Sequence, residues 1–258
     1  MEIQAAQITG WVTAFLWPLL RVSGMVMVAP VFGANVVPVR VRIVLALALT
    51  VLVAPLAPAP PELQPLAAAG LLAMAQQILT GVAIGFAVQL AFDALIMAGQ
   101  TVAMTMGLGF ATLVDPARGA ATPVLSQLLL ILGLLLYLSL DGHLALIAVL
   151  ADSFRGPAGG AGFGIGEAWT LAAWGGRIFE AGLVIALPAV IALLVVNFGM
   201  GIVSRAAPQL NLFAVGFPVA MLAGFLVLLL SLPALRTGFT QLLEEALALA
   251  GQMAGGGR

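Results

Sequence analysis

Long apolar runs, separated by single charged residues or small charged groups, make up most of this chain. The longest runs without a charged residue cover 43–61, 63–92, 94–114, 119–140, 181–204 and 206–235. A helix that crosses a lipid bilayer needs about 20 predominantly apolar residues, and most of these runs are long enough. The pattern therefore predicts a protein built mainly of apolar α-helices.

Clusters of proline and glycine divide the runs into separate helices. The proline-rich segment 54–65 and the glycine-rich segment 152–166 each interrupt any helix. We place helices at 8–32, 40–54, 66–104, 120–140, 143–153, 168–200, 209–231 and 236–252. The piece 143–153 is too short to cross a bilayer, whereas 66–104 overshoots a hydrocarbon core of about 30 Å. We expect an all-α integral membrane protein of kinked helical hairpins, in one domain spanning 1–258.

The final predicted helix, 236–252, is amphipathic. One face carries apolar residues at helical spacing, and Glu244 and Glu245 lie opposite. The apolar face consists of Phe239, Leu242, Leu243, Ala246, Leu247 and Ala250. We expect this helix to pack at an interface or on a partner, and we expect a disordered tail over 253–258.

Composition extends the membrane interpretation. Hydrophobic residues make up 63% of the chain and charged residues 7%, whereas an average soluble domain carries about 25% charged residues. Lipid or other apolar protein must therefore surround much of the chain. The net charge of −1 gives no electrostatic argument for nucleic-acid binding, and the absence of cysteine excludes disulfides and thiolate metal sites.

Residues that could carry catalysis are sparse. The single histidine, His143, follows Asp141 by two positions, and no other His or Cys exists to complete a metal site. The chain contains no GxSxG motif, no HExxH motif and no phosphate-binding glycine loop. We therefore expect no enzymatic activity, no cofactor and no metal, and we interpret Asp141 and Gly142 as the cap and break at a helix start.

Ionisable side chains within apolar segments are costly to bury and usually mark a function or a partner. The candidates are Arg21, Asp93, Glu180 and Arg205. Gln89, Asp93 and Gln100 fall on one narrow stripe of the predicted helix, and Gly81 and Gly85 form a GxxxG pair that permits close helix contact. A proton or substrate pathway through Asp93 is one interpretation of the stripe. An interhelical hydrogen-bond network is the one we favour.

A proline-bracketed segment interrupts two apolar helices near the C-terminus. In AAPQLNLFAVGFP (206–218), Pro208 and Pro218 enclose the amide side chains of Gln209 and Asn211. Polar, proline-broken backbone at membrane depth is tolerated only where protein or a water-filled cavity satisfies it. We assign Pro208, Gln209 and Asn211, together with the stripe and the glycine pair, to helix packing and subunit contacts.

The segment 106–123, MGLGFATLVDPARGAATP, has a similar character at the centre of the chain. Its middle is apolar, which is unusual for a surface loop. Gly107 can leave a helix sharply because glycine reaches left-handed backbone angles, and Pro116 disfavours helix at Asp115. A constriction or plug inside a channel and a re-entrant bend buried in ordinary packing both fit this pattern.

With these motifs in hand, the chain resembles the FliR family of flagellar biosynthetic proteins, membrane components of the type III export gate. The resemblance covers most of residues 11–218, and its most specific parts are MGLGFATLVDP and APQLNLFAVGFP. It also runs through FLWPLLRVSGMVMVAPVFG, QQILTGVAIGFAVQLAFDALIMAGQ and GHLALIAVLADSF. One departure is Asp141, where the family pattern has Asn before Gly-His.

The resemblance implies a helical protein that joins several copies of FliP and FliQ to form the secretion pore for flagellar proteins. It implies a place in the bacterial inner membrane at the flagellar basal body, with an FlhB-like switch protein at the cytoplasmic mouth. It also implies that one loop lies in the pore as part of the closed gate. The matching residues here are Gly107, Leu108, Gly109, Phe110, Ala111, Thr112, Leu113, Val114, Asp115 and Pro116.

Two other functions are the alternatives to a non-enzymatic channel subunit of the flagellar gate. The first is the injectisome relative that serves virulence secretion, although FLWPLLRV favours the flagellar branch. The second, from a different class, is a small secondary transporter with Asp93 as its coupling residue. Many such transporters are built from inverted repeats, and we find no internal repeat in this sequence.

Overall fold

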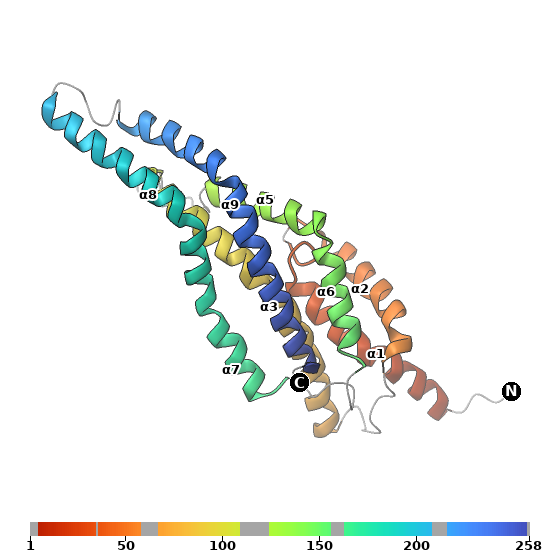
Figure 1. Ribbon diagram of the computed structural model, residues 1–258. Coiled ribbons are helices and arrows are strands. Elements are labelled where there is room, and N and C mark those ends of the chain that lie inside the picture. Colours follow the sequence, from red (N-terminus) through yellow and green to blue (C-terminus); the bar gives the residue numbers. More distant parts are fainter. Residues whose placement is uncertain are drawn as a thin grey trace. The chain divides into compact units, whose positions relative to one another are not determined.

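The chain folds as a set of helices, several of them long. The computed structural model describes residues 5–34, 36–57, 67–108, 124–155, 163–207 and 216–256. Every regular element in these ranges is a helix (Figure 1). In chain order they are α1 (Ala5–Val28), α2 (Val39–Val53), η1 (Ala54–Leu56), α3 (Ala68–Thr105), α5 (Val124–Ser139), α6 (Gly142–Asp152), α7 (Ile165–Trp174), α8 (Gly176–Ala206), α9 (Phe217–Gly251) and η5 (Gln252–Gly256). The all-α prediction is confirmed.

Two predicted helix boundaries are wrong. From Phe217 onward, the predicted helices 209–231 and 236–252 are one continuous helix, α9, with Pro233 inside it, and 209–215 lie outside the described residues. Proline removes only one backbone donor, and an apolar helix tolerates it where neighbouring groups satisfy the freed carbonyl. Conversely, the predicted helix 168–200 is divided into α7 and α8 at Gly175, where two consecutive glycines give a low helix propensity.

Membrane-spanning capacity is a property of most of these helices. By length and composition, four helical stretches in the described residues can cross a membrane: Val39–Leu56, Ala68–Thr105, Ile165–Ala206 and Phe217–Gly255. A fifth span is possible if α5 and α6, which meet at a bend of 65°, cross together. The described residues thus contain four or five apolar helical stretches able to span a membrane, in agreement with the prediction of an all-α membrane protein.

The bend between α5 and α6 has a local cause. Asp141 takes a left-handed conformation with φ of 55° and ψ of 24° and forms no side-chain capping bond to α6. Gly142 begins α6, and a β-carbon there would overlap the ring of Tyr137. The expected helix start at Gly142 is therefore found, but the bend depends on backbone conformation and close packing rather than on a carboxylate cap.

Contacts divide the chain into two compact units. The first unit contains Met1–Leu90, Tyr137–Trp174 and Leu243–Arg258, and the second contains Ala91–Leu136 and Gly175–Leu242. Three of the four divisions fall inside helices, namely α3, α5 and α9, and the fourth falls at the break between α7 and α8. Because three helices thus contribute to both units, we retain the single-domain assignment as a prediction.

The core of the first unit is apolar but contains buried polar residues. Its fully buried apolar side chains include Val22, Met25, Ile84, Leu146 and Leu150. Its buried polar residues include Arg21, Thr50, Gln77, Thr80 and Ser153. Burying such groups is costly unless they are hydrogen-bonded, so the partners of these residues are part of what determines this unit's structure.

The second unit has a narrow core and a broad exposed apolar surface. Phe92 and Phe239 meet edge-to-face, with ring centroids 5.3 Å apart, and the same unit buries Leu95, Leu129 and Leu193. Much of α8 and of the first part of α9 is exposed. Examples are Phe179, Val195, Phe198, Leu222 and Leu230, each between 65% and 74% exposed. Apolar patches of this extent require lipid or a partner protein to cover them.

The C-terminal segment differs from the sequence prediction in its surroundings. Of the predicted apolar face, Phe239, Leu242, Leu243, Ala246 and Ala250 are at most 3% exposed, and Leu247 is half-buried. The chain itself already covers this face, so a partner is not needed to bury it. The expected disordered tail does not hold for Met253 and Ala254, which are buried in η5, whereas Gly255 departs from helical geometry with a φ of 84°. Residues 257–258 lie outside the described residues.

Candidate functional site

The predicted glycine pair lies at a close crossing of two helices in the first unit. A β-carbon on Gly81 would collide with the carbonyl oxygen of Arg21 and lie 3.0 Å from the amide nitrogen of Met25. A β-carbon on Gly85 would lie 2.8 Å from the carbonyl oxygen of Met25. On the α1 side, Gly24 approaches α3 equally closely. Absence of side chains therefore lets the backbones of α1 and α3 touch, a packing mode typical of membrane helices.

At the same crossing, the guanidinium of Arg21 is completely buried and joins α3 to the end of α6. Its Nε donates to Gln77 Oε1 at 2.8 Å, and Nη1 donates to the Ser153 carbonyl oxygen at 2.7 Å and to Ser153 Oγ at 3.0 Å. The guanidinium carbon lies 4.4 Å from the centroid of the Phe154 ring. We call these four residues the Arg21 network. A buried cation is tolerated when its donors are paired in this way.

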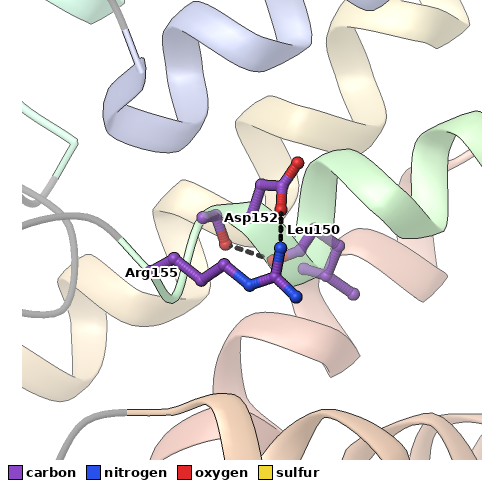
Figure 2. Close-up of polar contacts among 4 residues, drawn as sticks. Leu150, Asp152 and Arg155 are labelled. Atoms are coloured by element: carbon purple, nitrogen blue, oxygen red, sulfur yellow. Dashed lines mark hydrogen bonds and ion pairs between the residues drawn. The ribbon is translucent and has the colours of Figure 1, made fainter.

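The end of α6 is held by further hydrogen bonds next to this network. Ser153 Oγ donates to the Leu150 carbonyl oxygen at 2.6 Å, and Arg155 Nη1 bonds the Asp152 carboxylate at 3.0 Å on the surface (Figure 2). Cations near a helix C-terminus interact favourably with its exposed carbonyl groups. Arg21 and Arg155 therefore both stabilise the last turn of α6, one from inside the protein and one from the surface.

The α6–α7 connection returns to the same helix. The backbone N–H of Phe163 bonds Thr80 Oγ1 at 3.3 Å, and Thr80 lies one turn from Gln77 on α3. Sequence reasoning noticed Arg21 as an ionisable residue in an apolar run but missed Gln77, Thr80 and Ser153. The available signal was that Gln77 and Thr80 lie three positions apart in a mostly apolar helix, because i and i+3 share one helix face.

The other ionisable candidates have different surroundings. Glu180 pairs with Arg177 at 2.6 Å on the surface of α8, and Arg205 is exposed in the last turn of that helix. Asp93 is half-buried in α3, and it is not without an interaction partner. Gln89 is also half-buried and partnered, whereas Gln100 is exposed. The hydrogen-bond network proposed for this stripe remains a prediction.

The predicted plug segment begins at a well-defined helix end in the second unit. Gly107 has a φ of 81°, its N–H bonds the Met104 carbonyl at 3.0 Å, and the N–H of Leu108 bonds the Ala103 carbonyl at 3.0 Å. These two bonds form a Schellman motif, in which a left-handed residue ends the helix and satisfies its last carbonyls. Asn197 of α8 adds a bond from Nδ2 to the Thr105 carbonyl at 3.1 Å. The chain therefore leaves α3 abruptly at Gly107.

The remaining predicted site residues lie outside the described residues. They are Gly109, Phe110, Ala111, Thr112, Leu113, Val114, Asp115 and Pro116 of the plug segment, and Pro208, Gln209 and Asn211. Within the part of the chain that the structure describes, no group of three or more His, Asp or Glu side chains is arranged to hold a metal ion.

Comparison with known proteins identifies the family. The family model "Bacterial export proteins, family 1" matches residues 12–246. The flagellar biosynthetic protein FliR of Pectobacterium carotovorum is 41% identical over 93% of this chain and 92% of its own length. FliR of Escherichia coli K12 is 37% identical over 95% of this chain and 94% of its own length. The chain belongs to the FliR family of bacterial export proteins.

The match to the FliR family includes the principal features described above. Residues 12–246 contain the α1–α3 crossing, the Arg21 network, the helix end at Gly107 and the segment 208–215. The resemblance drawn from the sequence motifs is therefore confirmed. The buried C-terminal turn with Met253 lies beyond the matched range.

Proposed function

We propose that this chain is a non-enzymatic channel subunit of the flagellar type III protein export gate. It resides in the bacterial inner membrane at the flagellar basal body and assembles with FliP-like and FliQ-like membrane subunits. An FlhB-like switch protein borders its cytoplasmic mouth. The polypeptides that pass are unfolded flagellar proteins. The observation that carries the proposal is FliR-family membership over nearly the whole chain.

The exposed apolar surface supports a subunit role. In the second unit, α8 and the first part of α9 present large apolar side chains along their length. In each of the stretches Ile165–Ala206 and Phe217–Gly255, only 22% of the most apolar 18 consecutive residues are buried. Helices that completed a stand-alone bundle would bury one apolar stripe against each other. Partner helices and lipid together would cover the surface that remains.

The plug assignment is the second part of the proposal. Gly107 hinges the segment at the end of α3, Phe110, Leu113 and Val114 block the closed channel, and Asp115-Pro116 ends the plug. The left-handed φ of Gly107 and the abrupt helix end support a chain that turns away from α3 at this point. An apolar constriction stops water and ions by dewetting, so no enzymatic gate is required.

Assembly provides the first test. The chain is extracted in detergent after expression alone and after co-expression with the FliP-like and FliQ-like subunits of the same organism. We expect a single stable complex only in the co-expressed sample, because the apolar faces of α8 and α9 need partners. A monodisperse, stable protein from expression alone would contradict the subunit role and favour a self-contained transporter.

Conductance tests the plug. Cells that express the partner subunits receive either the wild-type chain or a deletion of residues 108–114. We expect the deletion complex to assemble and to leak small ions, seen as slower growth under ionic stress. An assembled complex that remains tight would show that the segment is not the plug, while the subunit role would stand.

A further inference from the structure

A cleft opens in the second unit where three helices end or begin. It is lined by the end of α3 (Met104–Gly107), by Met200 and Gly201 of α8, and by the start of α9 at Phe217. Its volume is about 530 Å³, which lies in the range of about 300–1,000 Å³ typical of ligand pockets. The cleft adjoins Gly107, the residue at which the proposed plug segment leaves α3.

Hydrogen bonds within the chain already occupy several polar groups in the wall of this cleft. Asn197 Nδ2 donates to the Thr105 carbonyl at 3.1 Å, and Thr105 Oγ1 donates to the Thr101 carbonyl at 2.8 Å. The Gly107 N–H is bonded to Met104. Apart from these groups and the Asn197 amide oxygen, the lining is mostly thioether, aromatic, alanine and glycine surface, so the cleft suits a mainly apolar ligand.

We propose that this cleft binds apolar side chains of the polypeptide during export. The inference rests on the proposed function and adds a binding site to it. Three methionines, Met104, Met106 and Met200, line the cleft. Met104 is exposed and Met200 half-buried, whereas Met106 is 1% exposed and forms the base of the cleft's wall. Methionine is unbranched and polarizable, and surfaces that accept many sequences use it for that reason. An export gate passes proteins of different sequence, which calls for contacts of this adaptable kind.

The composition of the cleft favours a passing chain over a permanent partner. A fixed interface gains its stability from complementary, rigid packing of large anchors. Here flexible thioethers alternate with bare glycine backbone, and Met104 is 65% exposed. Binding should therefore be weak and tolerant of sequence, as transit requires. A partner subunit or another part of this chain in the cleft would be a different result, which the experiment below detects.

Two glycines of α8 provide a matched pair of variants. Gly201 lines the cleft and Gly199 does not. A β-carbon on either residue would meet no atom within 4 Å, so neither Gly201→Leu nor Gly199→Leu creates a clash within the chain. Both substitutions raise helix propensity to the same extent. Because the two positions lie about 200° apart around the helix, only Gly201→Leu fills the cleft.

The variants are expressed in a strain that lacks its own copy of the gene, and flagellar proteins secreted into the medium are quantified. Assembly of the complex is followed by co-purification of the partner subunits. We expect Gly201→Leu to assemble and to secrete about tenfold less than wild type. This factor corresponds to a loss of about 1.4 kcal/mol of binding free energy. Gly199→Leu should secrete at the wild-type level. Equal secretion by the two variants would overturn the inference. So would loss of assembly in Gly201→Leu alone, because the cleft would then be a subunit contact.

A photoreactive residue identifies the occupant directly. With benzoylphenylalanine at position 200 and a flagellar export substrate stalled by a folded domain, we expect a crosslink to the substrate. A crosslink to a partner subunit or within the chain instead would refute the inference. If the wild-type chain supports secretion, each of these failures concerns the cleft alone. If secretion does not depend on the chain at all, the proposed function fails first.

Discussion

Replacing Arg21 by methionine tests whether the buried guanidinium holds the first unit together. Methionine retains much of the side-chain length but donates no hydrogen bond. The substitution leaves Gln77 Oε1 and the Ser153 carbonyl, both buried, without the donors that lie 2.8 Å and 2.7 Å away. It also removes the cation from the Phe154 ring. We expect a marked loss of stability.

The size of the loss follows from these contacts. A buried acceptor left without a donor costs about 1–3 kcal/mol, and a desolvated cation–π contact is worth about 2 kcal/mol. Because the variant no longer pays the desolvation penalty of a buried charge, part of this loss is offset. We therefore expect Arg21→Met to lower the free energy of unfolding by about 3 kcal/mol. For a chain of this length, that loss lowers Tm by about 6–12 °C. Typical total stabilities are only about 5–15 kcal/mol, so abundance in the membrane should also fall.

A double-mutant cycle separates the network from general packing. Removing both partners in Arg21→Met/Gln77→Leu leaves one fewer unpaired acceptor, so its cost should be smaller than the sum of the single costs by about 1–2 kcal/mol. Arg236→Met, at an exposed position on α9, is the control. Tm is measured for each variant in the purified complex. A Tm for Arg21→Met within about 2 °C of the control, well short of the expected shift, would refute this reasoning.

Three further predictions follow from other parts of the structure. Gly81→Leu should abolish accumulation of the chain in membranes, because its β-carbon meets backbone atoms of α1. The control Gly166→Leu, at a position where a β-carbon meets no atom within 4 Å, should accumulate normally, and equal levels of the two variants would contradict the close crossing. Asp93→Asn should retain motility and complex yield if the residue is structural; lost motility with intact assembly would instead support a proton pathway. Truncation after Gln252 removes the buried Met253 and should lower Tm, whereas truncation after Gly256 should not; identical Tm values would show that the last turn contributes nothing.

Periodicity and composition predicted most of the helices because the signals are local. The helix expected over 66–104 is Ala68–Thr105, and the one expected over 143–153 is Gly142–Asp152. The helix end at Gly107 followed from glycine alone. The continuity of α9 through Pro233 was missed because the effect of a proline depends on whether other groups satisfy the freed carbonyl, and neighbours in space are not visible in a sequence.

The Arg21 network illustrates the limit of local reasoning more clearly. Arg21 and Gln77 are 56 residues apart in the chain, and Arg21 and Ser153 are 132 apart. A single sequence shows that an arginine lies in an apolar run, but the partner of a buried charge is chosen by tertiary packing. The cleft beside Gly107 likewise combines residues from three helices. Met106, Gly107 and Phe217 belong to the two most specific sequence motifs, but neither motif shows that these residues meet in space.

Secretion in a deletion strain tests the export role most directly. The gene is deleted in its own organism, flagellar proteins in the culture medium are quantified, and the wild-type chain is then supplied in trans. If the chain is a channel subunit of the export gate, the deletion should abolish secretion of these proteins while their intracellular synthesis continues. The chain supplied in trans should restore secretion. Secretion at the wild-type level in the deletion strain would contradict the proposed function.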